Sequence, residues 1–529
     1  MPSDCISYQK SGYFSKLIVD YLDEKSELET LYNRFPKIEN FREQIAEKQQ
    51  NFSVENRHVL VSELEKQYAN FEISDATKSN IKLLTNSNTF TITTGHQLNL
   101  FTGPLYFIYK IVSTINLCKQ LKKEYPNNNF VPIYWMATED HDFEEINHFH
   151  CKEVTIRWNR ESFGPVGRLS TEGLDNVFDV FSNVIGHSLN AEKLKELFIN
   201  TYIKQSNLAD ASRYIANELF KKEGLVIIDG DSKALKKICI PYIKKELLEQ
   251  ASFKNVNQTK EHLKKYFIQV NPREINLFYI EDTIRERIIL ENGIYKIKNT
   301  AIQFTETDIL IELENHPERF SPNVILRPLY QEVVLPNLCY IGGGGELAYW
   351  LELKSNFEAN KITFPVLLLR DSVILVSEKQ SQKANKLNLT WNDLFSNQDE
   401  LLNSKTKEYS KFKIDFTEQK ESLKKQFGNL HKIAIQTDKS FIGAVKAQET
   451  KQIKGLENLE KRLLKAEKKV HKEELERITL LQNELFPNQI LQERKANFSE
   501  FYLEHGDLMI EKISIELNAI SQEFKIITL

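Results

Sequence analysis

The chain has 529 residues, which is too long for one compact core, so two or three structural units are expected. Hydrophobic residues make up 41% and charged residues 27%, and the net charge is −4. These values are ordinary for a globular protein and favour neither a nucleic acid nor a membrane as a partner. The opening residues lack the pattern of a signal peptide, and no apolar run approaches a membrane span. Five cysteines in so long a chain suit a reducing compartment, so we expect a cytoplasmic protein.

The first two thirds of the chain predict an α/β core. Residues 1–85 have helical apolar spacing and form the expected N-terminal helical part of this core. Between residues 86 and 376, short apolar runs alternate with helical segments, which predicts a Rossmann-like, mostly parallel sheet. Strands are expected at 89–93, 131–135, 224–228, 324–327 and 364–369. Two insertions interrupt the alternation, near 152–175 and 253–320, and the second contains an Asn-Gly turn between alternating strands.

The last third predicts an α-helical coiled-coil domain over residues 377–487. Apolar residues between Leu456 and Leu485 recur at steps of three and four, with a gap near Glu474. Residues 416–430 are the expected partner helix in the same chain, and Pro487 ends the long helix. Residues 488–529 return to amphipathic helices that are expected to dock on the core.

Polar residues follow the first predicted strand of the core. Gly95 permits a tight turn whose N–H groups face an anion, and His96 has the chemistry to polarise a phosphate or to act as a general acid–base. The alternative for His96 is an ordinary turn residue. Gly103 and Pro104 begin a helix whose N-terminus favours an anionic group. Lys110 lies about two turns further on, either in the site or on the surface.

An acidic and histidine cluster follows the strand at 131–135. Glu139, Asp140, His141 and Asp142 cannot all be buried without partners, so they lie in a solvated loop or serve a ligand. A carboxylate here suits a substrate amine or a Mg2+ ion bound to nucleotide phosphates. His141, oriented by Asp142 or Glu139, suits a base.

A glycine-rich loop, 342–345, precedes a predicted helix that begins near Glu346. Such a loop can cradle phosphate, but it lacks the lysine and hydroxyl residues of a P-loop, and a tight turn is an equal alternative. Arg370 ends the last predicted strand and suits a carboxylate or phosphate, or else a salt bridge to Asp371.

Neither zinc nor thiol catalysis is expected. The spacing of His148, His150 and Cys151 matches none of the usual zinc-ligand patterns. Cys118 and Cys339 have apolar neighbours and are expected in the core.

Several of these segments together resemble one enzyme family. TTGHQLNLFTGPLYFIYK (93–110), VPIYWMATEDHDFEEINH (131–148), YIGGGGELAYW (340–350), FPVLLLR (364–370) and QER (492–494) resemble BshC, the cysteine-adding enzyme of bacillithiol biosynthesis. The resemblance implies a Rossmann-like core with inserted segments, similar to class I aminoacyl-tRNA synthetases, and a coiled coil that forms a homodimer. It also implies the joining of L-cysteine, through its carboxyl group, to the amine of glucosaminyl-malate. The family pattern often has a second glutamine where this chain has His96, and no HIGH or KMSKS sequence is present.

The resulting hypothesis is a ligase that activates the cysteine carboxyl with ATP and Mg2+, without a resident metal. The expected catalytic residues are His96, Glu139, Asp140, His141 and Asp142. The expected substrate- or nucleotide-binding residues are Thr94, Gly95, Gln97, Gly103, Lys110, Trp135, Gly343, Gly345, Glu346, Tyr349 and Arg370. The alternatives are a sugar- or nucleotide-transferase that uses the same crevice and a non-enzymatic coiled-coil scaffold.

Overall fold

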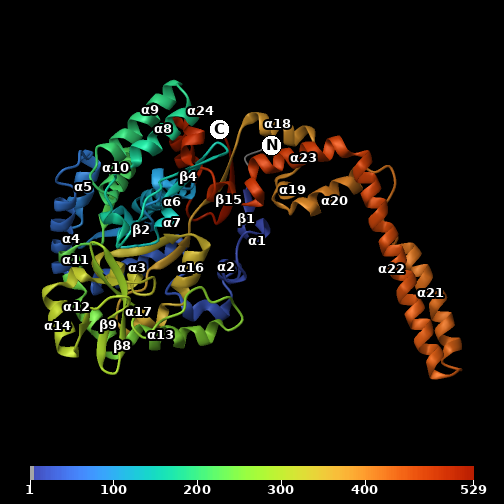
Figure 1. Ribbon diagram of the computed structural model, residues 1–529, viewed down its shortest axis with the longest axis horizontal. Helices are drawn as coiled ribbons and strands as arrows, with labels where there is room; N and C mark the ends of the chain where they lie inside the picture. The colour runs from blue at the N-terminus through green and yellow to red at the C-terminus, as the bar shows by residue number, and fades with distance from the viewer. Residues whose placement is uncertain (1–4) are drawn as a thin grey trace. The chain divides into compact units, whose positions relative to one another are not determined.

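The computed structural model describes residues 5–529 and divides into two compact units (Figure 1). One unit comprises residues 376–491. The other, which we call the core, comprises residues 5–375 and 492–527. Within residues 5–529, no helix combines the length and the apolar composition needed to cross a membrane.

A five-stranded parallel sheet forms the centre of the core, in the order β13-β12-β2-β3-β6. Its strands in chain order are β2 (Thr89–His96), β3 (Asn129–Met136), β6 (Val226–Asp229), β12 (Asn337–Gly342) and β13 (Val366–Leu369). The chain builds outward from β2 through β3 to β6, then returns to place β12 on the other side of β2. The strand order therefore reverses between β2 and β12, and ligands bind beyond the carboxyl ends of the strands at such a point. The predicted Rossmann-like fold is confirmed.

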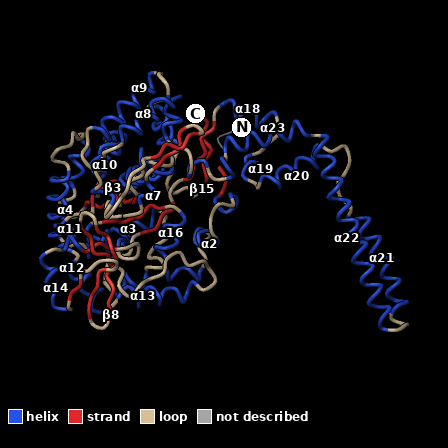
Figure 2. The backbone as a smooth tube through the Cα atoms, viewed as in Figure 1, coloured by secondary structure: helices blue, strands red, loops and turns tan. Residues whose placement is uncertain are grey.

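The sheet is buried, and helices cover its faces (Figure 2). Its strands are mainly apolar, except that β2 also buries four threonines. Helix α6 (Tyr106–Glu124) packs on β2 and β3 and buries thirteen of its nineteen residues. Phe90, Leu117, Cys118 and Cys339 share one core cluster, as expected for these two cysteines. The remaining α-helices of the core are α1 (Tyr8–Ser11), α2 (Lys16–Leu22), α3 (Phe41–Asn51), α4 (Val54–Gln67), α5 (Asp75–Leu83), α7 (Phe143–Ile146), α8 (Leu174–Ile185), α9 (Leu189–Phe198), α10 (Leu208–Phe220), α11 (Lys233–Ile238), α12 (Ile240–Glu249), α13 (Ala251–Lys260), α14 (Glu306–Asn315), α15 (Arg327–Val334), α16 (Gly344–Leu351), α17 (Lys354–Ala359), α24 (Phe498–His505) and α25 (Leu508–Glu516).

Two local predictions in the core are wrong. The strand expected at 324–327 is a turn that leads into α15, because the Asn323 side chain accepts the N–H groups of Ile325 and Leu326. The next strand of the parallel sheet, β12, begins only after α15 has ended. The turn expected at Gly95 is also absent, because β2 continues through His96 and pairs Gly95 with Trp135 of β3.

The two predicted insertions form small antiparallel structures. The hairpin at the first insertion pairs β4 (His148–Cys151) with β5 (Val154–Arg157), so it begins a few residues before the predicted start at 152. The second forms a five-stranded sheet, in the order β10-β9-β8-β7-β11. Its strands are β7 (Leu277–Glu281), β8 (Ile284–Glu291), β9 (Ile294–Ile297), β10 (Gln303–Phe304) and β11 (Phe320–Pro322). Asn292 and Gly293 connect β8 and β9 with φ values of 52° and 77°, so the predicted Asn-Gly hairpin is confirmed.

The terminal regions, predicted to be helical, also contain strands. A three-stranded sheet has the order β1-β15-β14, with β1 at Cys5–Ser7, β15 at Glu523–Thr528 and β14 at Ser372–Val376. This sheet joins segments from both ends of the chain, which the local sequence patterns do not indicate.

The unit 376–491 is helical, and its predicted coiled coil is confirmed (Figure 2). Its helices are α18 (Glu378–Lys386), α19 (Trp391–Phe395), α20 (Gln398–Tyr409), α21 (Thr417–Ala434), α22 (Lys439–Val470) and α23 (Lys472–Leu485). Helices α21 and α22 lie side by side, and Leu423 and Phe427 pack near Ile442 and Val445. The long helix breaks at His471, close to the predicted gap in the apolar pattern.

Candidate active site

A cavity of about 880 Å3 lies at the carboxyl edge of the parallel sheet, where the strand order reverses. Residues at the ends of β2, β3, β12 and β13 form part of its wall. Twelve of the residues predicted from the sequence line it: Gly95, His96, Gln97, Lys110, Trp135, Glu139, Asp140, Gly343, Gly345, Glu346, Tyr349 and Arg370.

Four predicted residues lie outside the lining of this cavity. The Thr94 hydroxyl donates to the carbonyl of Ile341 at 2.7 Å and so connects β2 to β12. Gly103 has a φ of 63°, and its carbonyl accepts a hydrogen bond from the Asn497 side chain. His141 and Asp142 are exposed in the loop after β3.

His96 is buried and neutral at physiological pH. Its ring packs against Tyr106 and Phe107, and its Nε2 atom has no hydrogen-bond partner among the described residues. Burial, followed by the nearby charge of Lys110, lowers the pKa of His96 to about 3. The neutral imidazole can therefore donate or accept a hydrogen bond with a ligand, but it supplies no positive charge. Because His96 is the last residue of β2, its alternative as an ordinary turn residue is wrong.

Lys110 and Glu346 form an ion pair within the cavity wall. The Lys110 Nζ atom lies 2.6 Å from Glu346 Oε2 and donates to the carbonyl of Gly95 at 2.7 Å. Lys110 is buried, so its alternative placement on the surface is wrong. Burial would raise the pKa of Glu346, but the charge and hydrogen bond of Lys110, together with the hydrogen bonds from Gly343 and Tyr340, hold the pKa below its usual value.

Glu346 also occupies the start of α16. Its carboxylate accepts the N–H group of Gly343 at 2.8 Å and the hydroxyl of Tyr340 at 2.7 Å. The Gly343 N–H, in the loop that could cradle a phosphate, is therefore used by this carboxylate. The glycine-rich loop shapes the cavity without forming a P-loop.

Arg370 is held by a buried carboxylate from the C-terminal segment. Its Nη2 and Nη1 atoms lie 2.7 and 3.0 Å from the two carboxylate oxygens of Glu493. Glu493, rather than Asp371, is thus its ion-pair partner. The Arg370 Nε atom is buried and has no hydrogen-bond partner within residues 5–529.

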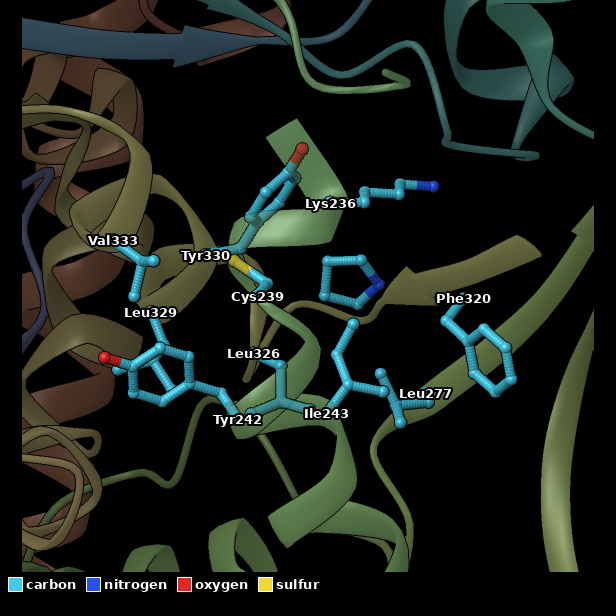
Figure 3. A pocket seen from close by; sticks show the side chains of 11 residues that line it. Lys236, Cys239, Tyr242, Ile243, Leu277, Phe320, Leu326, Leu329, Tyr330 and Val333 are labelled. Carbon is cyan, nitrogen blue, oxygen red and sulfur yellow. The ribbon is translucent and has the colours of Figure 1, made fainter. Parts of the chain in front are cut away.

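The acidic loop after β3 is fixed by two sets of contacts. Glu139 forms an ion pair with the buried Lys236, which Figure 3 shows extending away from the apolar side chains that surround its helix. Asp140 accepts hydrogen bonds from Gln97 at 3.1 Å and from the backbone N–H of His141 at 2.8 Å. Burial would raise the pKa of Asp140, but the side chain of His141, these two hydrogen bonds and the charge of Arg285 lower it well below its usual value. Asp140 is therefore ionised.

Five arginines that we did not expect in the site complete the cavity, although one of them belongs to the QER motif. They are Arg273, Arg285, Arg287, Arg327 and Arg494. Across residues 5–529, none of the five forms an ion pair with a carboxylate. Arg285 lies over the ring of Phe278, with 4.1 Å between its Cζ atom and the ring centroid. The sequence did contain an indication of this arginine cluster. Arg285 and Arg287 are two residues apart in a strand, so their side chains lie on the same face of the sheet.

Comparison with known protein families matches residues 1–371 to the N-terminal Rossmann-like domain of bacillithiol biosynthesis BshC, and residues 373–529 to its C-terminal coiled-coil domain. The chain belongs to the BshC family. A relative in Flavobacterium psychrophilum is 65% identical over 100% of this chain and 99% of its own. One in Christiangramia forsetii is 56% identical over 100% and 99%, and one in Bacillus cereus is 28% identical over 94% and 95%.

All three relatives are designated provisionally as the cysteine ligase BshC, which supports a ligase. A crystal structure described provisionally as an arginyl-tRNA synthetase from Campylobacter jejuni matches 79% of this chain and 99% of its own. The match has 10% identity and a TM-score of 0.20, which is too low to carry an argument.

Proposed function

We propose that the cavity joins the carboxyl group of L-cysteine to the amine of glucosaminyl-malate, with ATP and Mg2+ for activation. Membership of the BshC family supports this reaction. The observation that carries it is the set of five arginines in one cavity, each without a carboxylate partner among residues 5–529. Arg285, Arg287 and Arg327 are half-buried, whereas Arg273 and Arg494 are exposed. A cluster of arginines of this kind suits polyanions, and ATP and the malate group are both polyanionic.

The arginines, rather than His96 and Gly95, are the proposed phosphate and malate ligands. A neutral His96 contributes at most a hydrogen bond, and its low pKa makes it a poor general base. Among the described residues, no group of three or more metal-ligating side chains is placed to hold an ion. In our proposal, Mg2+ arrives bound to the nucleotide phosphates.

The carboxylates are the proposed ligands for the positive groups of the substrates. Asp140 is ionised and lines the cavity, so it suits the ammonium group of either substrate. The amine of glucosaminyl-malate attacks the activated carbonyl carbon, a C–N bond forms, and the activating group leaves. The proton released from that amine passes to solvent water, because the lowered pKa of Asp140 makes its carboxylate a poor base.

Mass spectrometry tests the reaction directly. Purified protein is incubated with ATP-Mg, L-cysteine and glucosaminyl-malate, and we expect cysteinyl-glucosaminyl-malate together with AMP or ADP. The released nucleotide identifies the activation chemistry. Asp140→Asn should reduce product formation, and the matched change Asp415→Asn, in the helical unit, should not. Absence of product from folded wild-type protein contradicts the proposal, and tighter binding of a nucleotide sugar than of cysteine would favour a transferase.

We also propose that the helical unit forms a homodimer. Helices α21 and α22 and the loop after α21 expose several large apolar side chains, namely Leu430, Ile433, Ile435, Leu459 and Val470. Exposed apolar residues on a long helical hairpin favour association with a second copy. Light scattering should give a dimeric mass for the wild type and a monomeric mass for Ile433→Glu/Leu459→Glu. A dimer that survives this double substitution contradicts the proposed interface.

A further inference from the structure

The guanidinium of Arg370 has almost no hydrogen-bonding capacity left for a ligand. Besides the two oxygens of Glu493, its Nη1 atom contacts the carbonyl of Asp371 at 2.8 Å and the hydroxyl of Ser372 at 3.2 Å. Arg370 and Glu493 are both buried, with side chains 4% and 1% exposed. Within the described part of the chain, Nε is the one nitrogen of this guanidinium without a partner, Nη2 donates to Glu493, and Arg370 lies in the wall of the cavity.

Distant parts of the chain fix the backbone of the segment that carries this guanidinium. The Tyr8 hydroxyl donates to the carbonyl of Arg370 and accepts the N–H of Ser372, both at 3.3 Å. Glu493 accepts the N–H of Val373 at 3.1 Å. The same carboxylate therefore holds both the guanidinium and the backbone that follows it.

The residue between these contacts is fixed from α6. The Ser113 hydroxyl donates to the Asp371 carboxylate at 2.7 Å and accepts the N–H of Asp371 at 3.1 Å. Both residues are buried. Neither the backbone at Arg370 nor its guanidinium is therefore free to turn.

We infer that Glu493 is a positioning residue for the ligase site. It neutralises Arg370, and it orients the guanidinium so that a ligand receives one directional hydrogen bond from Nε–H. The cationic charge for anionic ligands then comes from the five arginines described above. This inference rests on the proposed function, because it takes the cavity to be the site of the ligation reaction.

Gly343 lies beside the Nε–H group of Arg370. A Cβ atom at this position would lie 3.8 Å from Arg370 Nε and 3.5 Å from Glu346 Oε2, which are ordinary contacts. Its φ of −74° suits an alanine. Gly343→Ala should therefore fold normally and place a methyl group beside the Nε–H group of Arg370.

Steady-state kinetics test the role of Glu493. Glu493→Gln should raise the KM of one substrate about 10- to 100-fold, the usual effect of losing a hydrogen bond to a charged group, with kcat changed less. Because Glu493 acts through Arg370, the double variant Arg370→Gln/Glu493→Gln should be no worse than Arg370→Gln alone. Gly343→Ala should raise the KM of the same substrate, whereas Gly455→Ala, in α22, should change nothing. The inference would be overturned if Arg370→Gln and Glu493→Gln each lowered kcat equally and their effects added in the double variant.

A spectroscopic measurement tests the geometry without any activity. In deuterated protein labelled with 15N-arginine, the Nε–H resonance of Arg370 is identified by its loss in Arg370→Lys. We expect slow solvent exchange of this proton in the wild type and fast exchange in Glu493→Gln. If the wild type makes no product but shows this change, the proposed function fails and the positioning role stands. If product forms and Glu493→Gln keeps both slow exchange and the wild-type KM, the positioning role fails.

Discussion

Removal of the Lys48 ammonium should destabilise the core, because it leaves a buried carboxylate without its cation. Lys48 and Glu332 are 2% and 0% exposed, and their charged atoms lie 3.0 Å apart. The other oxygen of Glu332 accepts hydrogen bonds from Asn337 at 2.7 Å and Gln331 at 3.0 Å. The Lys48→Met substitution therefore removes the charge partner and keeps these two hydrogen bonds.

The expected loss is about 3–5 kcal/mol, the usual result of breaking a buried ion pair on one side. Unfolding entropy is about 2.1 cal/mol/K per residue, or about 0.85 kcal/mol/K for the roughly 400 residues of the core. Dividing the two gives a decrease in Tm of about 4–6 °C. Intrinsic fluorescence during thermal unfolding measures this change.

The loss of stability caused by Lys48→Met should grow as the pH rises. Burial, opposed by Lys48, already raises the pKa of Glu332 above its ordinary 4.5, and without Lys48 it rises further. A raised carboxyl pKa favours the protonated folded state, so stability is retained below the unfolded pKa and lost as the pH rises through the folded one. Lys48→Met should therefore lower Tm more at pH 8 than at pH 5.5. The double variant Lys48→Met/Glu332→Gln should recover at least half of the loss at pH 8. A decrease below about 1 °C for Lys48→Met, or no recovery in the double variant, would refute the reasoning.

Three further predictions concern the site and its support. His96→Gln should keep ligase activity within a few-fold and leave its pH profile unchanged between pH 6 and 8, because His96 is already neutral there; a new ionisation in kcat/KM would contradict this. Lys110→Met should raise the pKa of Glu346 and reduce kcat/KM more at pH 6 than at pH 8, and an equal reduction at both would argue against an ionised Glu346. Gly167→Ala should lower Tm and destabilise the core by about 1–3 kcal/mol, since its Cβ atom would lie 2.6 Å from that of Thr138; an unchanged Tm would show that the loop can move.

The fold was largely predictable because the buried strands are short runs of apolar and β-branched residues. Four of the five expected strands coincide with β2, β3, β6 and β13. The prediction at 324–327 failed because apolar residues alone do not distinguish a strand from a capped turn. The Asn323 side chain decided the local conformation, and Pro328 fits the first turn of the helix that follows.

The site was predictable where its residues follow strands directly. His96, Glu139 and Asp140 lie at the expected edge because parallel strands bring their carboxyl ends together. Arg285 comes from an insertion, and no local pattern places an insertion over a sheet. The ion-pair partner of a site residue also depends on tertiary structure. Arg370 alone suggested a positive charge for a ligand, but Glu493, 123 residues later in the chain, neutralises that charge.

Residues 492–494, which follow the helical unit in the chain, bind back to the part of the core that precedes this unit. The chain leaves the core after Leu375 and returns at Gln492, whose side chain accepts the N–H of Leu375 at 2.9 Å and donates to its carbonyl at 3.0 Å. Glu493 then neutralises Arg370, and Arg494 lines the cavity. A chain that ended at Leu375 would keep the parallel sheet but would leave the Arg370 guanidinium buried without its carboxylate, an arrangement that strongly destabilises a folded protein. The Rossmann-like part of the sequence therefore depends on the C-terminal segment for both its stability and a complete site.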